Sequence, residues 1–247
     1  MELRLEPAKA VLQLRSDGAA ILAAAGRSGL DAPVPTCPGW RVSDLLSHLA
    51  TIYAVRVELL RGYLDHRPVD PTPEADVLAW FESTHAELVG LLRSSDLTRE
   101  TWTFIGPRPA AFWTRRMALE TAIHRADAEV AAGGEPPRVD AIVAIDGIDE
   151  ILTVFLAERL PRAGTVGGSG ETIAVHTPDE RWHITLEASA VLVDRGSSAA
   201  ADALIAGTPS HVLYHLWGRL PADEVDVRGS ETARTALAEA LARAVDA

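Results

Sequence analysis

Cysteine is almost absent from this chain. Its 247 residues contain one cysteine, Cys37, so an intrachain disulfide is impossible and a metal site made of several thiolates is excluded. Any metal site must therefore use histidine and carboxylate side chains as ligands. Cys37 itself lies in a proline-rich segment, where we expect it to act as a small packing residue.

Positive charge is also scarce. The chain carries 23 Lys and Arg residues against 35 Asp and Glu residues, which leaves a formal net charge of −12. No continuous stripe of Lys and Arg is available to neutralise a phosphate backbone, so nucleic acid is a poor partner. The lack of a basic amphipathic helix likewise argues against docking on a membrane surface.

Long apolar runs are missing as well. No stretch reaches the roughly 18 consecutive apolar residues that a membrane span needs. The first residues, MELRLEPAK, lack the basic segment followed by an apolar segment that marks a secretory signal. We therefore expect a cytoplasmic protein with no membrane partner.

The sequence does have the composition of a globular protein, with 47% hydrophobic and 23% charged residues. Its first part shows apolar side chains at helical spacing, interrupted by proline and glycine. The expected helices cover residues 6–27, 43–62, 74–93, 111–132 and 139–160. The first four of these can close a four-helix bundle.

The remaining residues, 163–247, differ in character. They begin with a glycine-rich stretch and continue with apolar side chains at every second position, which predicts strands. Strands are expected over 171–177 and within 181–195, followed by a short strand, a helix, another short strand and a closing helix. The sequence thus predicts two domains, a helical bundle over 1–162 and a small α+β domain over 163–247.

A possible metal site lies in the expected bundle. Glu120 and His124 are four residues apart, so both lie on one face of the fourth helix. Their neighbours Ala118 and Ile123 are apolar, and an unpaired carboxylate in such surroundings is costly. His48, near the start of the second helix, is the third candidate ligand, because side chains of adjacent bundle helices converge in the core.

The donor set of this site suits zinc. Two histidines and one carboxylate leave coordination positions open, as in catalytic zinc sites. The same donors also suit nickel or iron, so the identity of the metal is open. The spacing alone is equally compatible with an exposed Glu and His pair and with a histidine that is simply satisfied in the core.

Longer segments carry a resemblance to a known family. The segments that resemble it in the first part are VPTCPGWRVSDLLSHL, RRMALETAIHRADAE and VDAIVAIDGIDEIL, and those in the second part are TIAVHTP, WHITLE and HVLYHLWGRL. The chain resembles the mycothiol-dependent maleylpyruvate isomerase family. The resemblance implies a DinB-like metal-binding four-helix bundle followed by a sterol-carrier-like α+β domain. The family's metal pattern falls on His48, Glu120 and His124.

The resemblance also implies a reaction. In that family the metal activates the thiol of mycothiol, a small thiol of actinobacteria. The thiolate adds to the cis double bond of a keto diacid, the carbon–carbon bond rotates, and elimination returns the thiol and a trans product. The same thiolate could instead attack another electrophile, which would make the chain a mycothiol S-transferase. A non-catalytic metal-binding or ligand-binding module, or a carrier of apolar ligands, is the remaining alternative.

Other residues are candidates for roles beside the metal. Arg219 lies where the resemblance places a functional arginine, so it is the predicted catalytic residue. Arg125 and Trp40 are the predicted binding residues for mycothiol, although an exposed arginine on a helix is the simpler interpretation of Arg125. Asp127 can orient the imidazole of His124, and the sequence is equally compatible with a surface carboxylate at this position.

The expected partners are mycothiol and a small-molecule substrate, and the expected state is a monomer or a weak homo-oligomer.

An acidic cluster formed by Asp146, Asp149 and Glu150 is expected to be a solvated helix face rather than a second metal site. The sequence does not specify the substrate.

Overall fold

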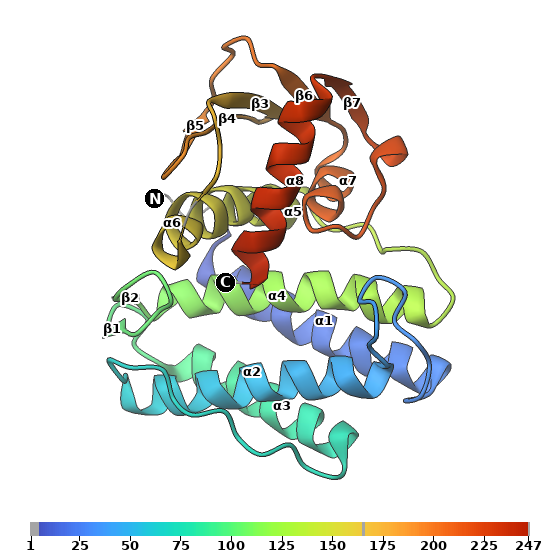
Figure 1. Cartoon of the computed structure of the whole chain (residues 1–247). Coiled ribbons are helices and arrows are strands. Elements are labelled where there is room, and N and C mark those ends of the chain that lie inside the picture. Colours follow the sequence, from blue (N-terminus) through green and yellow to red (C-terminus); the bar gives the residue numbers. More distant parts are fainter. Residues whose placement is uncertain (1–4, 165, 247) are drawn as a thin grey trace. The chain divides into compact units, whose positions relative to one another are not determined.

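A computed structural model describes residues 5–164 and 166–246 (Figure 1). The chain divides into two compact units, Met1–Pro137 and Arg138–Ala247. The first is helical and the second combines helices with a sheet, as the sequence predicts. Among the described residues, no helix is long and apolar enough to cross a membrane.

The first unit is the expected four-helix bundle. Its helices are α1 (Pro7–Ser28), α2 (Val42–Gly62), α3 (Val77–Ser94) and α4 (Ala111–Ala131). Helix α1 packs against α3 and α4, and α2 packs against α3 and α4. Two short paired strands, β1 (Glu100–Thr101) and β2 (Arg108–Pro109), precede α4 where the sequence indicated only a loop.

Two of these helices position the candidate site. Helix α2 begins where the carboxylate of Asp44 accepts a hydrogen bond from the backbone N–H of Arg41 at 2.8 Å, which satisfies a free donor at the helix start. It ends at Gly62 and is followed by Tyr63, which has a left-handed backbone conformation with φ of 47°. Helix α4 is buried along almost its whole length, so its polar side chains must find partners inside the unit.

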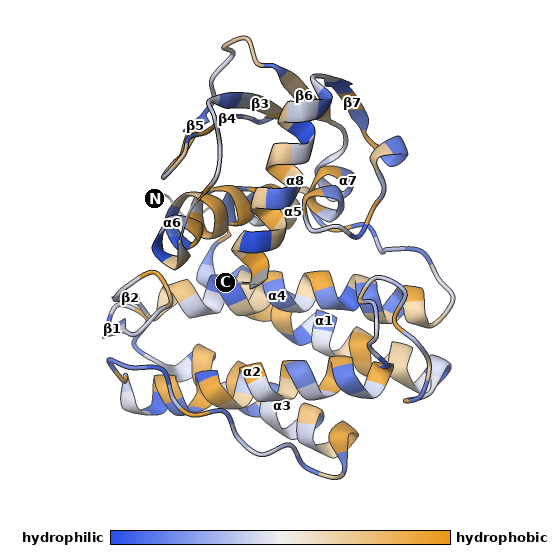
Figure 2. Ribbon diagram, in the orientation of Figure 1, coloured by the Kyte–Doolittle hydropathy of each residue, from blue (hydrophilic) through white to orange (hydrophobic). Residues whose placement is uncertain are grey.

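The second unit starts with one continuous helical segment. It consists of α5 (Ala141–Glu150), a π-helical stretch η1 (Ile151–Arg159) and α6 (Leu160–Ala163). Asp140 caps its start by accepting a hydrogen bond from the N–H of Ile142 at 2.9 Å. Figure 2 shows that α5 is largely hydrophobic.

A five-stranded mixed sheet completes the second unit with α7 (Pro209–Leu216), the short helix η2 (Ala222–Glu224) and α8 (Glu231–Asp246). The strands are β3 (Glu171–His176), β4 (Arg181–Leu186), β5 (Val191–Arg195), β6 (Ala203–Ala206) and β7 (Asp226–Gly229). Their order is β5-β4-β3-β6-β7, in which only β3 and β6 are parallel. The sequence segment 181–195 is therefore two strands of one hairpin.

The boundary between the units differs from the sequence-based one. The sequence placed it after residue 162, whereas the compact units meet after residue 137. The reason is that α5 packs against α7, while η1 packs against α8 and β5. The apolar helix 141–163 therefore belongs to the core of the second unit.

The sequence predicts that the acidic cluster in this helix is a solvated face, but the structure shows that it is buried. Asp146, Asp149 and Glu150 are all buried. Asp149 accepts a hydrogen bond from the indole N–H of Trp182 at 3.2 Å and lies 3.5 Å from a guanidinium nitrogen of Arg195. The expectation was wrong because this helix is packed on more sides than a surface helix would be.

Candidate metal centre

The structure brings His48, Glu120 and His124 together. Oε1 of Glu120 lies 3.3 Å from Nε2 of His48 and 3.4 Å from Nε2 of His124. One potential ligand atom from each residue lies within 4.8 Å of the others. This spacing allows all three side chains to contact a single ion after small side-chain movements.

Helix geometry explains the cluster. Glu120 and His124 are one turn apart on α4. Helix α2, which carries His48, packs against α4. The side chain of His48 is 34% exposed, whereas those of Glu120 and His124 are only 10% and 8% exposed. The cluster is therefore closed on the α4 side and open on the side of His48.

Glu120 is held as a carboxylate. Burial alone would raise the pKa of its carboxyl group, but Arg116 and hydrogen bonds from the two imidazoles outweigh burial and hold the pKa well below its usual value. The guanidinium of Arg116, one turn earlier on α4, binds Oε2. This contact leaves Oε1 directed at the two histidines.

His124 is held by Asp127. Its Nδ1 lies 2.8 Å from Oδ2 of Asp127, which is fully buried and also accepts a hydrogen bond from the thiol of Cys37 at 3.4 Å. Burial lowers the pKa of His124, but Asp127 and Glu120 raise it to about 8. When Nδ1–H donates to Asp127, Nε2 is the nitrogen available to an ion.

Cys37 extends this arrangement. Its sulfur, Nδ1 of His124 and a carboxylate oxygen of Asp127 form a second group of potential ligands within 4.8 Å. The sequence predicted only a packing role for Cys37, because the contact joins the loop before α2 to the last turns of α4. Sequence spacing carries no signal for such a contact.

Trp40 lies against both histidines. Its ring centroid is 5.0 Å from that of His48 and 6.2 Å from that of His124, with which it stacks at an interplanar angle of 17°. Trp40 is therefore adjacent to the cluster, as expected for a residue at the site. Its role in binding mycothiol remains a prediction.

The two predicted arginines lie elsewhere. Arg125 donates a hydrogen bond to Oδ1 of the buried Asp17 on α1 at 2.9 Å, and it does not line the pocket beside the cluster. Arg219 belongs to the second unit, where its guanidinium donates a hydrogen bond to the carbonyl oxygen of Trp217 at 2.7 Å. The roles assigned to both residues remain predictions.

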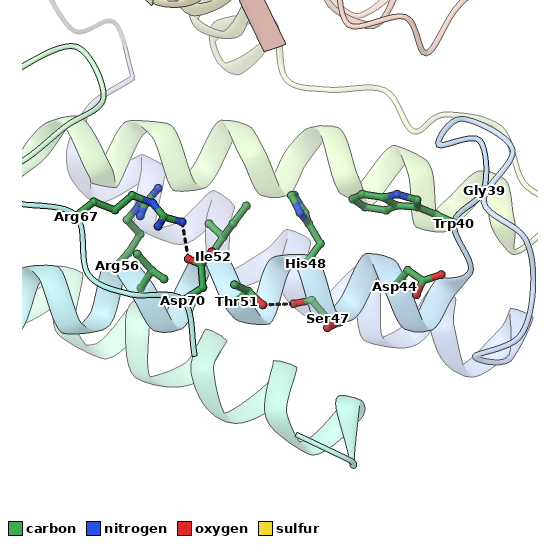
Figure 3. Close-up of a pocket in the computed structure, with 11 residues that line it drawn as sticks. Gly39, Trp40, Asp44, Ser47, His48, Thr51, Ile52, Arg56, Arg67 and Asp70 are labelled. Carbon is green, nitrogen blue, oxygen red and sulfur yellow. Dashed lines mark hydrogen bonds and ion pairs between the residues drawn. The ribbon is translucent and has the colours of Figure 1, made fainter. Parts of the chain in front are cut away.

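A pocket of ≈ 640 Å³ lies beside the cluster (Figure 3). Trp40 and His48 line one end, and Arg56, Arg67 and Asp70 line the other. Sequence reasoning missed this second end because Arg67 and Asp70 come from the long segment between α2 and α3. That segment has no periodic pattern from which its position could be predicted.

Comparisons with known proteins agree with this architecture. Residues 11–129 match the family described as Mycothiol maleylpyruvate isomerase N-terminal domain. Two solved structures are similar over 93% of this chain and 97% of their own chains, with a TM-score of 0.67 and 15% sequence identity. They are crystal structures of the mycothiol-dependent maleylpyruvate isomerase and of one of its mutants. At this identity they show a shared fold. No curated protein sequence matches.

Proposed function

We propose that this chain, whose residues 11–129 belong to the family described as Mycothiol maleylpyruvate isomerase N-terminal domain, is a metal-dependent enzyme that uses mycothiol to isomerise a cis double bond. The observation that carries the proposal is the convergence of His48, Glu120 and His124 around one point. The substrate is a small unsaturated acid of the maleylpyruvate type.

The three residues fit a divalent ion by their chemistry. Glu120 is an ionised carboxylate with one oxygen free of Arg116, and both imidazoles present Nε2 to that oxygen. Two histidines and one carboxylate are the donors of catalytic zinc sites, and zinc is the ion we propose.

A bound zinc ion lowers the pKa of a coordinated thiol, so that a thiolate is available near neutral pH. The chain's residues fix the site: Arg116 orients Glu120, and Asp127 orients His124. The single protein thiol, Cys37, donates a hydrogen bond to the carboxylate of Asp127 and does not line the pocket beside the cluster. An external thiol is therefore the better nucleophile.

The proposed reaction needs no oxidant or reductant. The thiol sulfur bonds to one alkene carbon and a proton to the next position of the conjugated acid, and the remaining carbon–carbon single bond rotates. Elimination then breaks the carbon–sulfur bond and returns the thiol and the proton. The alkene is regenerated in the trans form.

An assay with maleylpyruvate, mycothiol and zinc-loaded protein tests this proposal. We expect isomerisation that requires both thiol and metal, that stops after treatment with a chelator, and that returns with added zinc. Consumption of thiol by an electrophile without isomerisation would indicate an S-transferase instead. Bound metal without any thiol-dependent reaction would leave a non-catalytic binding module and overturn the proposal.

The proposal includes a setting for the enzyme. Mycothiol is a thiol of actinobacteria, so we propose a cytoplasmic enzyme of such a cell, active as a monomer or weak homo-oligomer. We propose that the second unit is sterol-carrier-like, with Arg219 contributing to catalysis and Trp40 to the binding of mycothiol. Arg125, which is bound to Asp17, is the less favoured binding residue.

Asp127 allows a finer test of the proposed centre. Asp127→Asn removes a buried charge that holds Nδ1 of His124, and the loss of such a partner typically weakens metal affinity by about 10- to 100-fold. We expect this loss in zinc titrations against a competing chelator. The matched variant Asp65→Asn changes an exposed carboxylate bound to His66 and should leave zinc affinity unchanged. Equal affinities for the two variants would contradict the assigned role of Asp127.

A further inference from the structure

The pocket beside the candidate metal centre contains a cation that the proposed chemistry has not used. At the end opposite Trp40, the guanidinium of Arg67 binds the carboxylate of Asp70, so these two charges neutralise each other (Figure 3). Arg56 lies on α2 and lines the same end of the pocket. Its backbone is eight residues beyond His48, which corresponds to a rise of about 12 Å along the helix.

Arg56 has no counter-ion at contact distance among the residues that the structure describes, and the carboxylates of Glu120 and Asp70 act on it only from farther away. It forms neither a hydrogen bond nor an ion pair with any described residue, and its Nε is buried without a partner. Its guanidinium lies 3.9 Å from the centroid of the Trp113 ring. Trp113 is itself fixed, because its indole N–H donates to the carbonyl oxygen of Trp102 at 2.9 Å. The flat guanidinium is thus held on a rigid aromatic surface.

Arg56 stays charged in this position. Burial and the nearby positive charges of Arg116 and Arg67 outweigh the carboxylates of Glu120 and Asp70 and lower the pKa of Arg56 to about 9. At neutral pH the side chain is therefore a largely desolvated cation, which is costly unless an anion binds it. An apolar side chain of similar length could pack on Trp113 without that cost, so packing alone does not explain an arginine here.

We propose that Arg56 is the anion-binding residue of this pocket and that it binds a carboxylate of the acidic substrate while the reacting part lies near His48. The inference rests on the proposed function and names a residue that determines its substrate class. A guanidinium can form two parallel hydrogen bonds to the two oxygens of one carboxylate. The single unpaired positive charge matches one carboxylate better than a dianionic phosphate.

A binding experiment tests this proposal without any turnover. Succinate is a saturated dicarboxylate that cannot be isomerised, and succinamide is its uncharged counterpart. By calorimetric titration of the zinc-loaded protein, we expect succinate to bind and succinamide not to bind. In Arg56→Met the succinate affinity should fall about 10- to 100-fold, the usual loss for a hydrogen bond between charged groups.

Two further variants serve as controls. Arg56→Lys keeps the charge without the planar fork, so its affinity for succinate should lie between those of the wild type and Arg56→Met. Arg61→Met removes an exposed arginine of the same helix, bound to Glu87 outside the pocket, and should leave succinate binding unchanged. All variants should keep the zinc content and the circular dichroism spectrum of the wild type.

Kinetics separate this inference from the proposed function. If the isomerase is active, Arg56→Met should raise the KM for the acid substrate by a similar factor with a smaller change in kcat. An active enzyme whose KM and succinate affinity are unchanged in Arg56→Met overturns the role of Arg56 and leaves the function standing. Succinate binding that depends on Arg56, in a protein without thiol-dependent activity, supports the anion site and overturns the function. Inorganic phosphate binding more tightly than succinate would overturn the choice of carboxylate.

Discussion

Replacing His48 with alanine is expected to abolish binding of the proposed metal and the proposed thiol-dependent activity while the bundle stays folded. His48 supplies one of three proposed ligands. Replacing a residue that only supports a ligand weakens metal affinity by up to roughly 100-fold, so replacing a ligand itself should weaken it more. Its side chain is 34% exposed, so its removal leaves little empty space in the core. Elemental analysis and a circular dichroism melt measure the two effects.

The other ligands are less suitable for this experiment. Glu120→Ala would also remove one ion-pair partner of the buried Arg116, and breaking a buried ion pair destabilises the fold. His66→Ala is the matched control, because His66 is exposed and its one ion-pair partner among the residues that the structure describes is the neighbouring Asp65. Unchanged metal content in His48→Ala, with a normal melt, would refute the proposed ligand set.

Replacing Gly18 with alanine is expected to destabilise the bundle strongly. A Cβ atom at Gly18 would lie 2.2 Å from Nε2 of His85, a buried side chain of α3. The imidazole would have to move and would lose its hydrogen bond to the carbonyl oxygen of Leu14, which spans 3.0 Å. Overpacking and the lost hydrogen bond together should cost about 2 to 5 kcal/mol.

The same helix provides a control substitution that is expected to increase stability rather than to decrease it. A Cβ atom at Gly26 of α1 meets nothing within 4 Å. Gly26→Ala should therefore stabilise the bundle by about 0.5 to 1 kcal/mol, because alanine loses less backbone entropy in a helix. Urea unfolding monitored by circular dichroism would compare both variants. A Gly18→Ala variant as stable as Gly26→Ala would show that the core around His85 is looser than the structure indicates.

Much of the fold was predictable from local patterns. The bundle helices depend on apolar side chains at helical spacing, and these patterns end at proline and glycine. The positions of Glu120 and His124 on one face follow from helix geometry alone. The approach of His48 to them required a resemblance to a known family, because spacing cannot determine which residues of two helices meet.

Other features depend on long-range packing and were missed. Cys37 contacts Asp127, and Arg67 lines the same pocket as Arg56. In both cases one residue lies in a loop without a periodic pattern of apolar residues, so the sequence does not predict where that residue lies in the fold. The predicted helix 139–160 was assigned to the first domain because the pattern changes from helical to strand spacing only after it. Its actual unit is decided by contacts with elements much later in the chain.

The unequal exposure of the three proposed ligands has a consequence for the rates at which a metal ion would bind and dissociate. Glu120 and His124 are fixed from behind by Arg116 and Asp127, whereas His48 borders the open pocket. An ion that binds at the proposed centre would therefore contact Glu120 and His124 first and His48 last, and it would leave by way of the same pocket. Ligands that fill the pocket should slow both the loading of the centre and its stripping by chelators.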